Sequence, residues 1–245
     1  MRFCDMSALG KFRVSGAAAH DFIRIMFTAD TALLAEPGSV APSLLLTGEA
    51  EVIDLVLIIR TGPDEYMVTT SPATIDEAFA WLSAHGKISD EEGAIFEGLA
   101  LSNETDKLAD VVLFGEGSTA VLEELAVGGF AASPCTGSLT MVQLDTVPAL
   151  MLASPVLPGE PSGEVFELFC SPAGAQGLAN AFLSFPEMEP VEVDEYRSLR
   201  AQQGTWFSQA AAAAYTFPDE AALMGFVRAP MDFVGGQALA ARLGE

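Results

Sequence analysis

Basic side chains are scarce in this sequence of 245 residues. Lysine and arginine together number 11, against 34 aspartates and glutamates, and the formal net charge is −23. A surface of this sign repels phosphate backbones and anionic lipid headgroups, which argues against nucleic-acid or membrane partners. An anionic ligand must find its cations among these few side chains. Arg197 and Arg200, three residues apart in a predicted helix, share one face and could provide them.

Histidine and cysteine are also rare. His20 and His85 leave little for metal ligation or a serine–histidine relay. The cysteines Cys4, Cys135 and Cys170 are odd in number and far apart, and none belongs to a C-x-x-C pair. This spacing excludes a zinc site and a disulfide framework. We therefore expect reduced thiols, a cytoplasmic location and no metal centre.

Long apolar runs are missing as well. The N-terminus carries no signal-peptide core, and no apolar run reaches the roughly 18 residues that a membrane span needs. Half of the residues are nevertheless apolar, which is enough for the core of one large domain or of two fused modules. The scattered acidic residues keep such a chain soluble.

The chain repeats a strand followed by a helix start. The strand-like segment Glu65–Thr70 runs into a Ser-Pro pair at positions 71 and 72, and Val165–Cys170 runs into the same pair at 171 and 172. Serine before proline marks a helix start, because the hydroxyl caps a free N–H and proline loses no hydrogen bond at the first helical position. The sequence therefore predicts a duplication.

Each copy reads as a strand, a helix, three strands and a second helix. Two strand-like runs lie between the helices of each copy, at Ser43–Thr47 and Val52–Arg60 and at Leu139–Asp145 and Ala149–Ala153. This order predicts an α+β fold of two related strand–helix–strand–strand–strand–helix units. We place the units at residues 1–105 and 106–190. A C-terminal helix and tail, residues 191–245, would pack on this core, with a strand-like piece from Phe226 and a short helix from Gly236.

One residue breaks the pattern of a buried strand. Seven of the eight residues of Val52–Ile59 are large and apolar, which predicts a strand buried on both faces. Asp54 in its middle would be a carboxylate in or near the interior, where an unpaired charge costs several kcal/mol or shifts its pKa upward. Two alternatives stay open. Asp54 is either a working carboxylate, or a residue at a strand end or bulge that faces solvent or a backbone N–H.

Two glutamates and two arginines are further candidates. The Pro/Gly-rich loop Pro155–Gly163 is a candidate site loop, Glu160 lies within it, and Glu164 follows it. Either carboxylate could accept a bidentate hydrogen bond from a guanidine-like ring edge, or could be an ordinary exposed glutamate. Arg197 and Arg200 could clamp an anionic ligand, or could pair with acidic neighbours on their own helix.

Short segments along the chain match a series of motifs in a fixed order. Phe3–Gly16 matches F-D-x-S-x-x-G-K-x-x-V-x-G, and Leu44–Asp54 matches L-L-L-N-x-x-G-G-I-I-D-D. Further segments match D-G-F-E-I, D-T-L-R-L-E, P-x-E-A and D-F-I-G-x-E-A-L, namely Val165–Leu168, Ser198–Arg200, Pro218–Ala221 and Asp232–Leu239. Taken in this order, the segments resemble the glycine cleavage system T-protein, the tetrahydrofolate-dependent aminomethyltransferase family.

The resemblance implies a tetrahydrofolate-binding, one-carbon (aminomethyl or methyl) transferase-like protein whose two units form the folate-binding core. Asp54 matches the first aspartate of the family's D-D pair, which contacts the folate near its reactive nitrogens. It would orient N5 and N10 and stabilise developing positive charge. Glu164, aligned with a gap, is the nearest match to a glutamate that grips the amino edge of the pterin, with Glu160 as its alternate. Arg200 matches an arginine of the folate-adjacent helix. Tetrahydrofolate and a small one-carbon donor are the implied ligands.

The sequence also departs from the family. The second aspartate is Leu55, a folate-stacking tyrosine falls on Pro42, and an asparagine falls on Ser71. The R-T-G-Y-T-G-E loop has become Ser154–Glu160, and the sequence stops where the family continues into a C-terminal barrel that helps to close the site. These departures favour an alternative, a non-catalytic folate-binding or interaction module with a protein partner. Examples are a small subunit of a sarcosine-oxidase-like complex and a folate-dependent maintenance factor.

Overall fold

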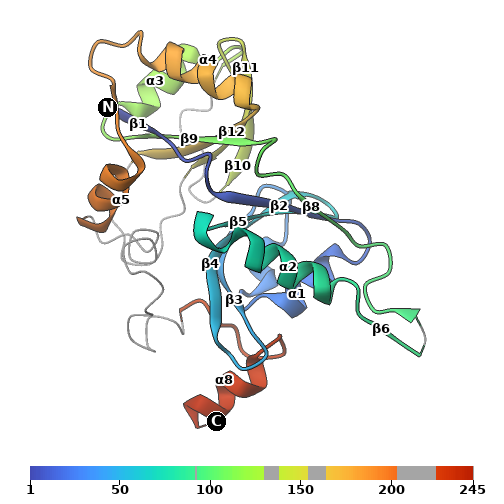
Figure 1. Ribbon diagram of the computed structural model, residues 1–245. Coiled ribbons are helices and arrows are strands. Elements are labelled where there is room, and N and C mark those ends of the chain that lie inside the picture. The colour runs from blue at the N-terminus through green and yellow to red at the C-terminus, as the bar shows by residue number, and fades with distance from the viewer. Residues whose placement is uncertain (92, 130–137, 154–163, 203–224, 245) are drawn as a thin grey trace. The chain divides into compact units, whose positions relative to one another are not determined.

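The computed structural model describes residues 1–91, 93–129, 138–153, 164–202 and 225–244. Within them the chain forms two compact units (Figure 1). The first-repeat unit contains Leu9–Glu104 together with the C-terminal tail. The second-repeat unit contains Met1–Ala8 together with the segment that begins at Thr105. The predicted α+β class and the two related units are confirmed.

The first-repeat unit is built on a five-stranded sheet in the order β3-β4-β5-β2-β8, in which all neighbouring strands are antiparallel. A small β6–β7 hairpin follows α2 and precedes β8. The elements in chain order are β2 (Gly10–Ser15), α1 (Ala19–Met26), the 3-10 turn η1 (Thr31–Leu34), β3 (Val40–Leu46), β4 (Val52–Gly62), β5 (Glu65–Thr70), the 3-10 turn η2 (Pro72–Thr74), α2 (Ile75–His85), β6 (Ser89–Asp90), β7 (Gly93–Ala94) and β8 (Ala100–Asn103).

The helices α1 and α2 supply apolar side chains to the main core of this unit. Phe22, Ile23 and Met26 of α1 recur at helical spacing and are all buried. Val56 and Ile58 of β4 belong to the same core, because alternate residues of a strand point to the same face of the sheet. The apolar run that predicted a buried strand therefore packs against helices on one of its faces.

The C-terminal tail also packs on the first-repeat unit. Phe233 is buried in a small cluster with Leu44 and Leu46 of β3. The predicted terminal helix is confirmed as α8 (Gly236–Leu243). The strand-like piece predicted from Phe226 is wrong, because the described residues 225–235 form turns and bends and bond to the region of α1 instead of joining a sheet.

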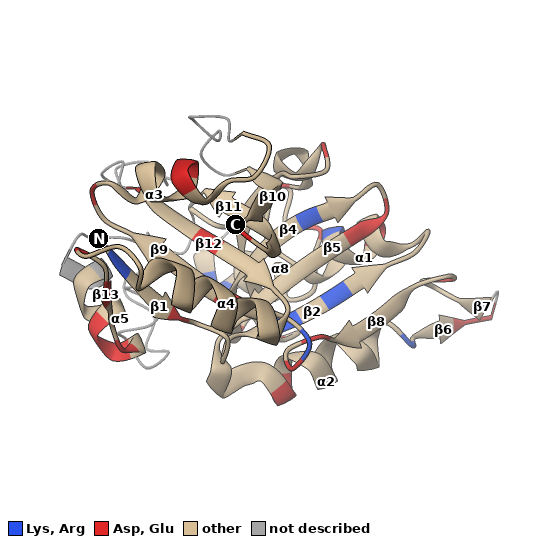
Figure 2. Ribbon diagram, turned by 90° about the horizontal axis from the view of Figure 1, so that it is seen from above, with Lys and Arg blue, Asp and Glu red and all other residues tan. Residues whose placement is uncertain are grey.

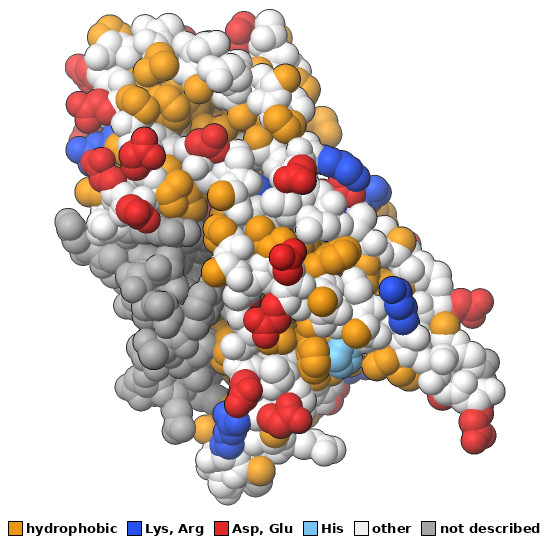
Figure 3. Space-filling view, in the orientation of Figure 1, with side chains coloured by type: hydrophobic (Ala, Val, Ile, Leu, Met, Phe, Trp, Pro, Cys, Tyr) orange, Lys and Arg blue, Asp and Glu red, His pale blue; other side chains and the backbone are white. Residues whose placement is uncertain are grey.

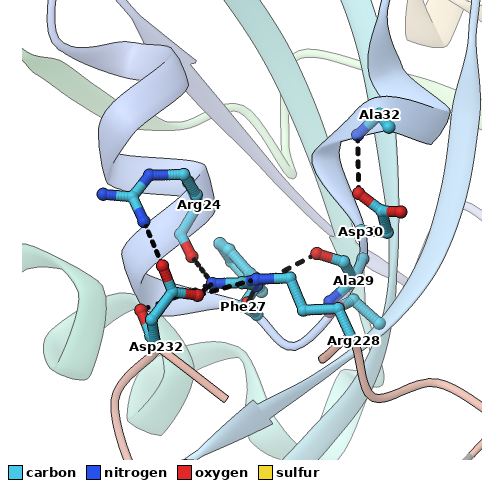
Figure 4. A network of polar contacts seen from close by, with 8 residues as sticks. Arg24, Phe27, Ala29, Asp30, Ala32, Arg228 and Asp232 are labelled. Carbon is cyan, nitrogen blue, oxygen red and sulfur yellow. Dashed lines mark hydrogen bonds and ion pairs between the residues drawn. The ribbon is translucent and has the colours of Figure 1, made fainter. Parts of the chain in front are cut away.

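Arg228 fastens this tail to the end of α1 (Figure 4). Its guanidinium donates to the carbonyl oxygens of Arg24 at 2.6 Å, Phe27 at 2.6 Å and Ala29 at 3.0 Å. Asp232 accepts from the same guanidinium at 2.9 Å and from Arg24 at 2.7 Å. The last carbonyl groups of a helix lack partners within the helix, and a cation beside them is favourable. The tail is thus joined to a helix near the other end of the chain.

The second-repeat unit carries a six-stranded sheet in the order β10-β11-β12-β9-β1-β13, antiparallel throughout except for the short β1–β13 pair. Its apolar core includes residues of β9, β11, β12, α3 and α4. The elements in chain order are β1 (Arg2–Asp5), β9 (Ala109–Phe114), α3 (Ser118–Leu125), β10 (Leu139–Leu144), β11 (Val147–Ala153), β12 (Val165–Cys170), α4 (Pro172–Phe182), β13 (Glu189–Pro190) and α5 (Val193–Gln202).

One strand from the N-terminus joins the sheet of the second repeat. β1 precedes the first repeat in the chain, yet it pairs antiparallel with β9 of the second. β8, in contrast, follows α2 of the first repeat and pairs antiparallel with β2 of the same repeat. The compact units therefore differ from the sequence division at residue 105, because Met1–Ala8 follows its strand partner into the second-repeat unit.

The repeats match closely where their first strand meets their first helix. The N–H of Gly16 donates to the carbonyl of Asp64 at 3.0 Å, and the N–H of Gly115 donates to the carbonyl of Glu164 at 2.9 Å. The two glycines have φ of +103° and +99°, a region that residues with a Cβ seldom adopt. The equivalence of the two turns puts Glu164 of the second repeat at the place of Asp64 in the first.

Acidic residues are spread over both units. Figure 2 shows them on α2, α3 and α5, among other elements. On the face drawn in Figure 3 the acidic side chains are scattered among apolar and polar ones. No helix among the described residues is both long and apolar enough to span a membrane.

Candidate functional site

Asp54 lies on β4 beside a bulge. Its pairing partner on β3 is Leu45, whereas the next residue, Leu46, pairs with Val52, so one extra residue of β4 is accommodated there. The Asp54 side chain is fully buried, with 0% of its surface exposed. The carboxylate is interior and lies beside a bulge, as the structural alternative describes, and a working role for Asp54 stays a prediction.

Four hydrogen bonds converge on the Asp54 carboxylate. Oδ1 accepts from the N–H of Leu55 at 2.8 Å and from the hydroxyl of Ser71 at 2.9 Å. Oδ2 accepts from the N–H of Ser71 at 2.7 Å and from the hydroxyl of Thr74 at 2.5 Å. A carboxylate offers about four lone-pair positions, and all are used. Asp54 lies on β4, next to β5, and its carboxylate holds the turn between β5 and α2 through these hydrogen bonds.

The ionisation of Asp54 reflects this environment. Burial raises the pKa of Asp54 above its ordinary value of 3.8, because the charged form loses its hydration. The hydrogen bonds from Thr74, Ser71 and Leu55 oppose that rise by stabilising the charge. Among the described residues no charged side chain contributes, so the carboxylate is held by dipoles alone. A raised pKa in a buried carboxyl is typical of groups that exchange a proton.

The second repeat carries an apolar residue at the equivalent position. After its first helix each repeat forms an isolated bridge to the next strand, at Leu45 in one and at Leu144 in the other. Leu45 pairs with Asp54, and Leu144 pairs with Val147. Asp54 and Val147 are therefore equivalent residues.

The helix that follows begins at the same place in both repeats but is capped differently. In the second repeat the Ser171 hydroxyl accepts the N–H of Gly174 at 3.1 Å, the ordinary serine cap. In the first repeat Ser71 makes no such cap, and its hydroxyl donates to Asp54 instead. Because the second repeat forms its helix beside Val147, this architecture does not itself require a carboxylate at that position.

Glu164 also lies at the start of a helix. Its Oε2 accepts the N–H of Thr119 in the first turn of α3 at 3.0 Å, which suits the positive end of the helix dipole. The side chain is half-buried, and its second carboxylate oxygen receives no hydrogen bond from the described residues. Glu164 belongs to the second-repeat unit and Asp54 to the first.

The other two predicted site residues are Glu160 and Arg200. Glu160 lies outside the described residues. Arg200 lies on α5, but its side chain and that of Arg197 are outside the described part of the chain. The helix itself is anchored by Tyr196, whose ring lies 4.9 Å from that of Phe114.

Sequence reasoning missed the donors around Asp54. The sequence predicts a helix start at Ser71, which also departs from the family, and assigns no role to Thr74. A Ser-Pro-x-Thr segment directly after a strand was the available signal, since both hydroxyls lie in one turn. Their acceptor, however, lies on another strand.

The model of the GCVT N-terminal domain family matches residues 1–230. The chain belongs to the GCVT N-terminal domain family. It is similar to the aminomethyltransferase of Chlorobaculum tepidum, with 30% identity over 163 residues, which are 66% of this chain and 42% of that protein. It is also similar to the aminomethyltransferase of Geobacillus kaustophilus, with 29% identity over 180 residues, which are 74% of this chain and 46% of that protein.

A solved GCVT-family structure shares the fold. The crystal structure of glycine cleavage system aminomethyltransferase T from Bartonella henselae superimposes with a TM-score of 0.79 at 20% identity. The superposition covers 99% of this chain and 63% of that one. The resemblance to the T-protein is thus confirmed in sequence and in fold, while the chain aligns with less than half the length of the two curated relatives.

Proposed function

We propose that this GCVT-family chain binds a reduced folate and takes part in one-carbon transfer of the aminomethyltransferase type, with Asp54 as the carboxylate that meets the ligand. The observation that carries the proposal is the contrast between Asp54 and Val147. The fold builds the same strand and helix with valine in the second repeat, so the cost of burying a charge in the first repeat calls for a purpose beyond folding.

The donors around Asp54 suit such a ligand. The N–H groups of Leu55 and Ser71 are fixed in the backbone, but the hydroxyls of Ser71 and Thr74 can rotate away. A ligand N–H can then take the place of a hydroxyl without leaving the carboxylate unpaired. Tetrahydrofolate would supply the nitrogen atoms that accept the one-carbon unit. Asp54 would orient those nitrogens, stabilise positive charge that develops on them and hold a proton.

Glu164 is proposed as an anchor for the amino edge of the pterin. One of its oxygens is held by α3, and a carboxylate whose orientation is fixed in this way can direct its other oxygen at a planar N–H edge. Glu160 and Arg200 remain proposed ligand contacts from the family resemblance. The donor of the one-carbon unit, a small amine, ether or thioether, is the expected second substrate, and a reducing cytoplasm suits buried cysteine thiols such as Cys4 and Cys170.

A non-catalytic folate-binding or interaction module is the second candidate. The observation in its favour is that all four hydrogen bonds to Asp54 come from its own chain, as in a structural cap. In that case folate would bind without turnover.

Calorimetric titration with 5-formyltetrahydrofolate tests the proposal. We expect binding to the wild type, and at least about tenfold weaker binding to Asp54→Asn, because the amide offers only one acceptor oxygen and loses the negative charge. Asp76→Asn is the matched control. It also replaces a carboxylate with an amide next to α2, but Asp76 is exposed in the first turn of that helix. Absence of heat with the wild type at high protein concentration would overturn the proposal. Binding without one-carbon transfer from any donor tested would select the second candidate.

A further inference from the structure

We infer that Thr74 is a positioning residue whose hydroxyl lets Asp54 carry either a negative charge or a proton without moving any other heavy atom. The inference deepens the proposed function, since a carboxylate that works beside an amine must accept and release a proton. It concerns Thr74 alone, and it rests on the geometry of the turn between β5 and α2.

The Thr74 hydroxyl has two acceptors within reach. Its Oγ1 lies 2.5 Å from Asp54 Oδ2 and 3.1 Å from the carbonyl oxygen of Ser71. A hydroxyl carries one proton, so it serves one of these acceptors at a time and can switch by rotation about its C–O bond. The side chain is 6% exposed, so water does not readily substitute for either acceptor.

The other donors around Asp54 have no second acceptor among the described residues. The N–H groups of Leu55 and Ser71 point where the backbone holds them. The Ser71 hydroxyl donates to Oδ1 at 2.9 Å, and the described residues offer it no second acceptor. Thr74 is therefore the donor that can leave the carboxylate and remain hydrogen-bonded.

The proton count balances in both states. With Asp54 charged, the Thr74 proton points to Oδ2, and every lone pair of the carboxylate is used. When Asp54 takes up a proton on Oδ2, that O–H donates to Oγ1 of Thr74, and the Thr74 proton turns to the Ser71 carbonyl. Each donor keeps an acceptor in both states, so neither state carries the cost of a buried unpaired group. The proton of the Thr74 hydroxyl stays bonded to Oγ1 in both states.

The second repeat lacks both members of the pair. Counting from the equivalent serines, Ser71 and Ser171, the position of Thr74 is taken by Gly174, and the position of Asp54 is taken by Val147. A Cβ on Gly174 would come within 2.9 Å of the Val147 side chain. The carboxylate and the hydroxyl thus occur together in one repeat and are absent together from the other, as expected for two groups that act as a unit.

The test is a carboxyl ¹³C NMR titration of Asp54 in three variants of the full chain. Thr74→Val keeps the shape of the side chain and removes the hydroxyl, and Thr74→Ser restores the hydroxyl. Thr70→Val is the matched control, because Thr70 is 2% exposed and its hydroxyl has no hydrogen-bond partner among the described residues. We expect Thr74→Val to shift the Asp54 titration to higher pH, because the charged form loses a donor. Thr74→Ser and Thr70→Val should titrate as the wild type does.

An unchanged Asp54 titration in Thr74→Val overturns the inference, as does a failure of Thr74→Ser to restore it. Urea unfolding of each variant separates this effect from a loss of stability, which would not move the titration of a folded protein. Titration with 5-formyltetrahydrofolate at several pH values distinguishes the inference from the proposed function. If the wild type binds no folate while the Thr74 variants shift Asp54 as expected, the proposed function fails and the role of Thr74 stands. If folate binds and the Asp54 titration is the same in Thr74→Val as in the wild type, the proposed function stands and the role of Thr74 fails.

Discussion

Asp54 and Val147 occupy the same position in the two repeats, and each lies against the first turn of the helix that follows. Asp54 accepts hydrogen bonds from the turn before α2, whereas Val147 packs against Gly174 of α4. The same position therefore accepts hydrogen bonds from the following turn in the first repeat and makes an apolar contact with the following helix in the second. A comparison of the two repeats within one chain therefore shows how a buried carboxylate differs from an apolar residue at this position.

Asp54→Val copies the second repeat into the first. We expect the free energy of unfolding to fall by about 1–3 kcal/mol, because buried N–H groups of Leu55 and Ser71 lose their acceptor. The loss is limited because the Ser71 hydroxyl can turn and cap the helix as Ser171 does. Urea unfolding monitored by circular dichroism measures the change. A midpoint equal to that of the wild type would show that these hydrogen bonds contribute nothing net.

Arg228→Ala should loosen the C-terminal tail. The side chain is only 8% exposed, and its removal leaves the carbonyl groups of Arg24, Phe27 and Ala29 without their donor. We expect a loss of about 2–4 kcal/mol in the free energy of unfolding, and faster chymotryptic cleavage in the tail, which contains Phe226 and Phe233. Arg13→Ala is the control. Arg13 is 54% exposed and pairs with Glu65 at the surface, so its loss should change stability by less than about 1 kcal/mol. Equal effects of the two variants would contradict the anchoring role.

The pairing of Asp232 predicts a pH dependence of stability. Slight burial opposes the shift, but the hydrogen bond and charge of Arg228 and the charge of Arg24 hold the pKa of Asp232 below its ordinary value of 3.8. A carboxyl with a lowered folded-state pKa stabilises the fold above its unfolded-state pKa and loses that contribution as pH falls through the folded-state value. The difference in stability between wild type and Asp232→Asn should persist at neutral pH and vanish only in strong acid. It should stay below about 1 kcal/mol, because Asp232 is 49% exposed and screened by solvent. A difference that grew towards acid would contradict the assignment.

Cys170 should be unreactive in the folded protein. Burial, with help from the negative charges of Asp110 and Asp5, raises the pKa of the Cys170 thiol to about 11. At pH 8 its thiolate fraction is then about a hundredfold smaller than in the unfolded chain, and the thiolate is the reactive form. Pulse labelling with iodoacetamide, followed by peptide mass spectrometry, should modify Cys170 only after denaturation. Labelling at the same rate in native and denatured protein would contradict the prediction.

Local patterns predicted much of the fold because they depend on neighbouring residues. The bounds predicted for Glu65–Thr70 and Val165–Cys170 are those of β5 and β12, and each Ser-Pro pair opens a helical segment. The pairing of β1 with β9 of the second repeat could not be predicted, since alternation shows that a segment is a strand but not which distant strand it joins. The tail from Phe226 reads as a strand by composition, yet the anchoring of Arg228 holds it in turns.

The candidate site shows the same limit. The apolar run around Asp54 predicted a buried carboxylate, which is confirmed. Its donors Ser71 and Thr74 lie 17 and 20 residues further along the chain. They are brought to it by the pairing of β4 with β5 and by the turn that follows. Hydrogen-bond partners of this kind depend on three-dimensional geometry that no spacing rule contains.

Because β1 pairs with β9, the part of the chain after residue 104 does not contain a complete sheet, whereas all five strands of the first-repeat sheet lie before that residue. A fragment that stops at residue 104 would carry β1 without β9, and a fragment that starts there would leave one flank of β9 open to solvent. Such an unpaired flank invites pairing with another chain. The second-repeat sheet is therefore completed only when the N-terminal strand is supplied, either by the same chain or by a second copy of it.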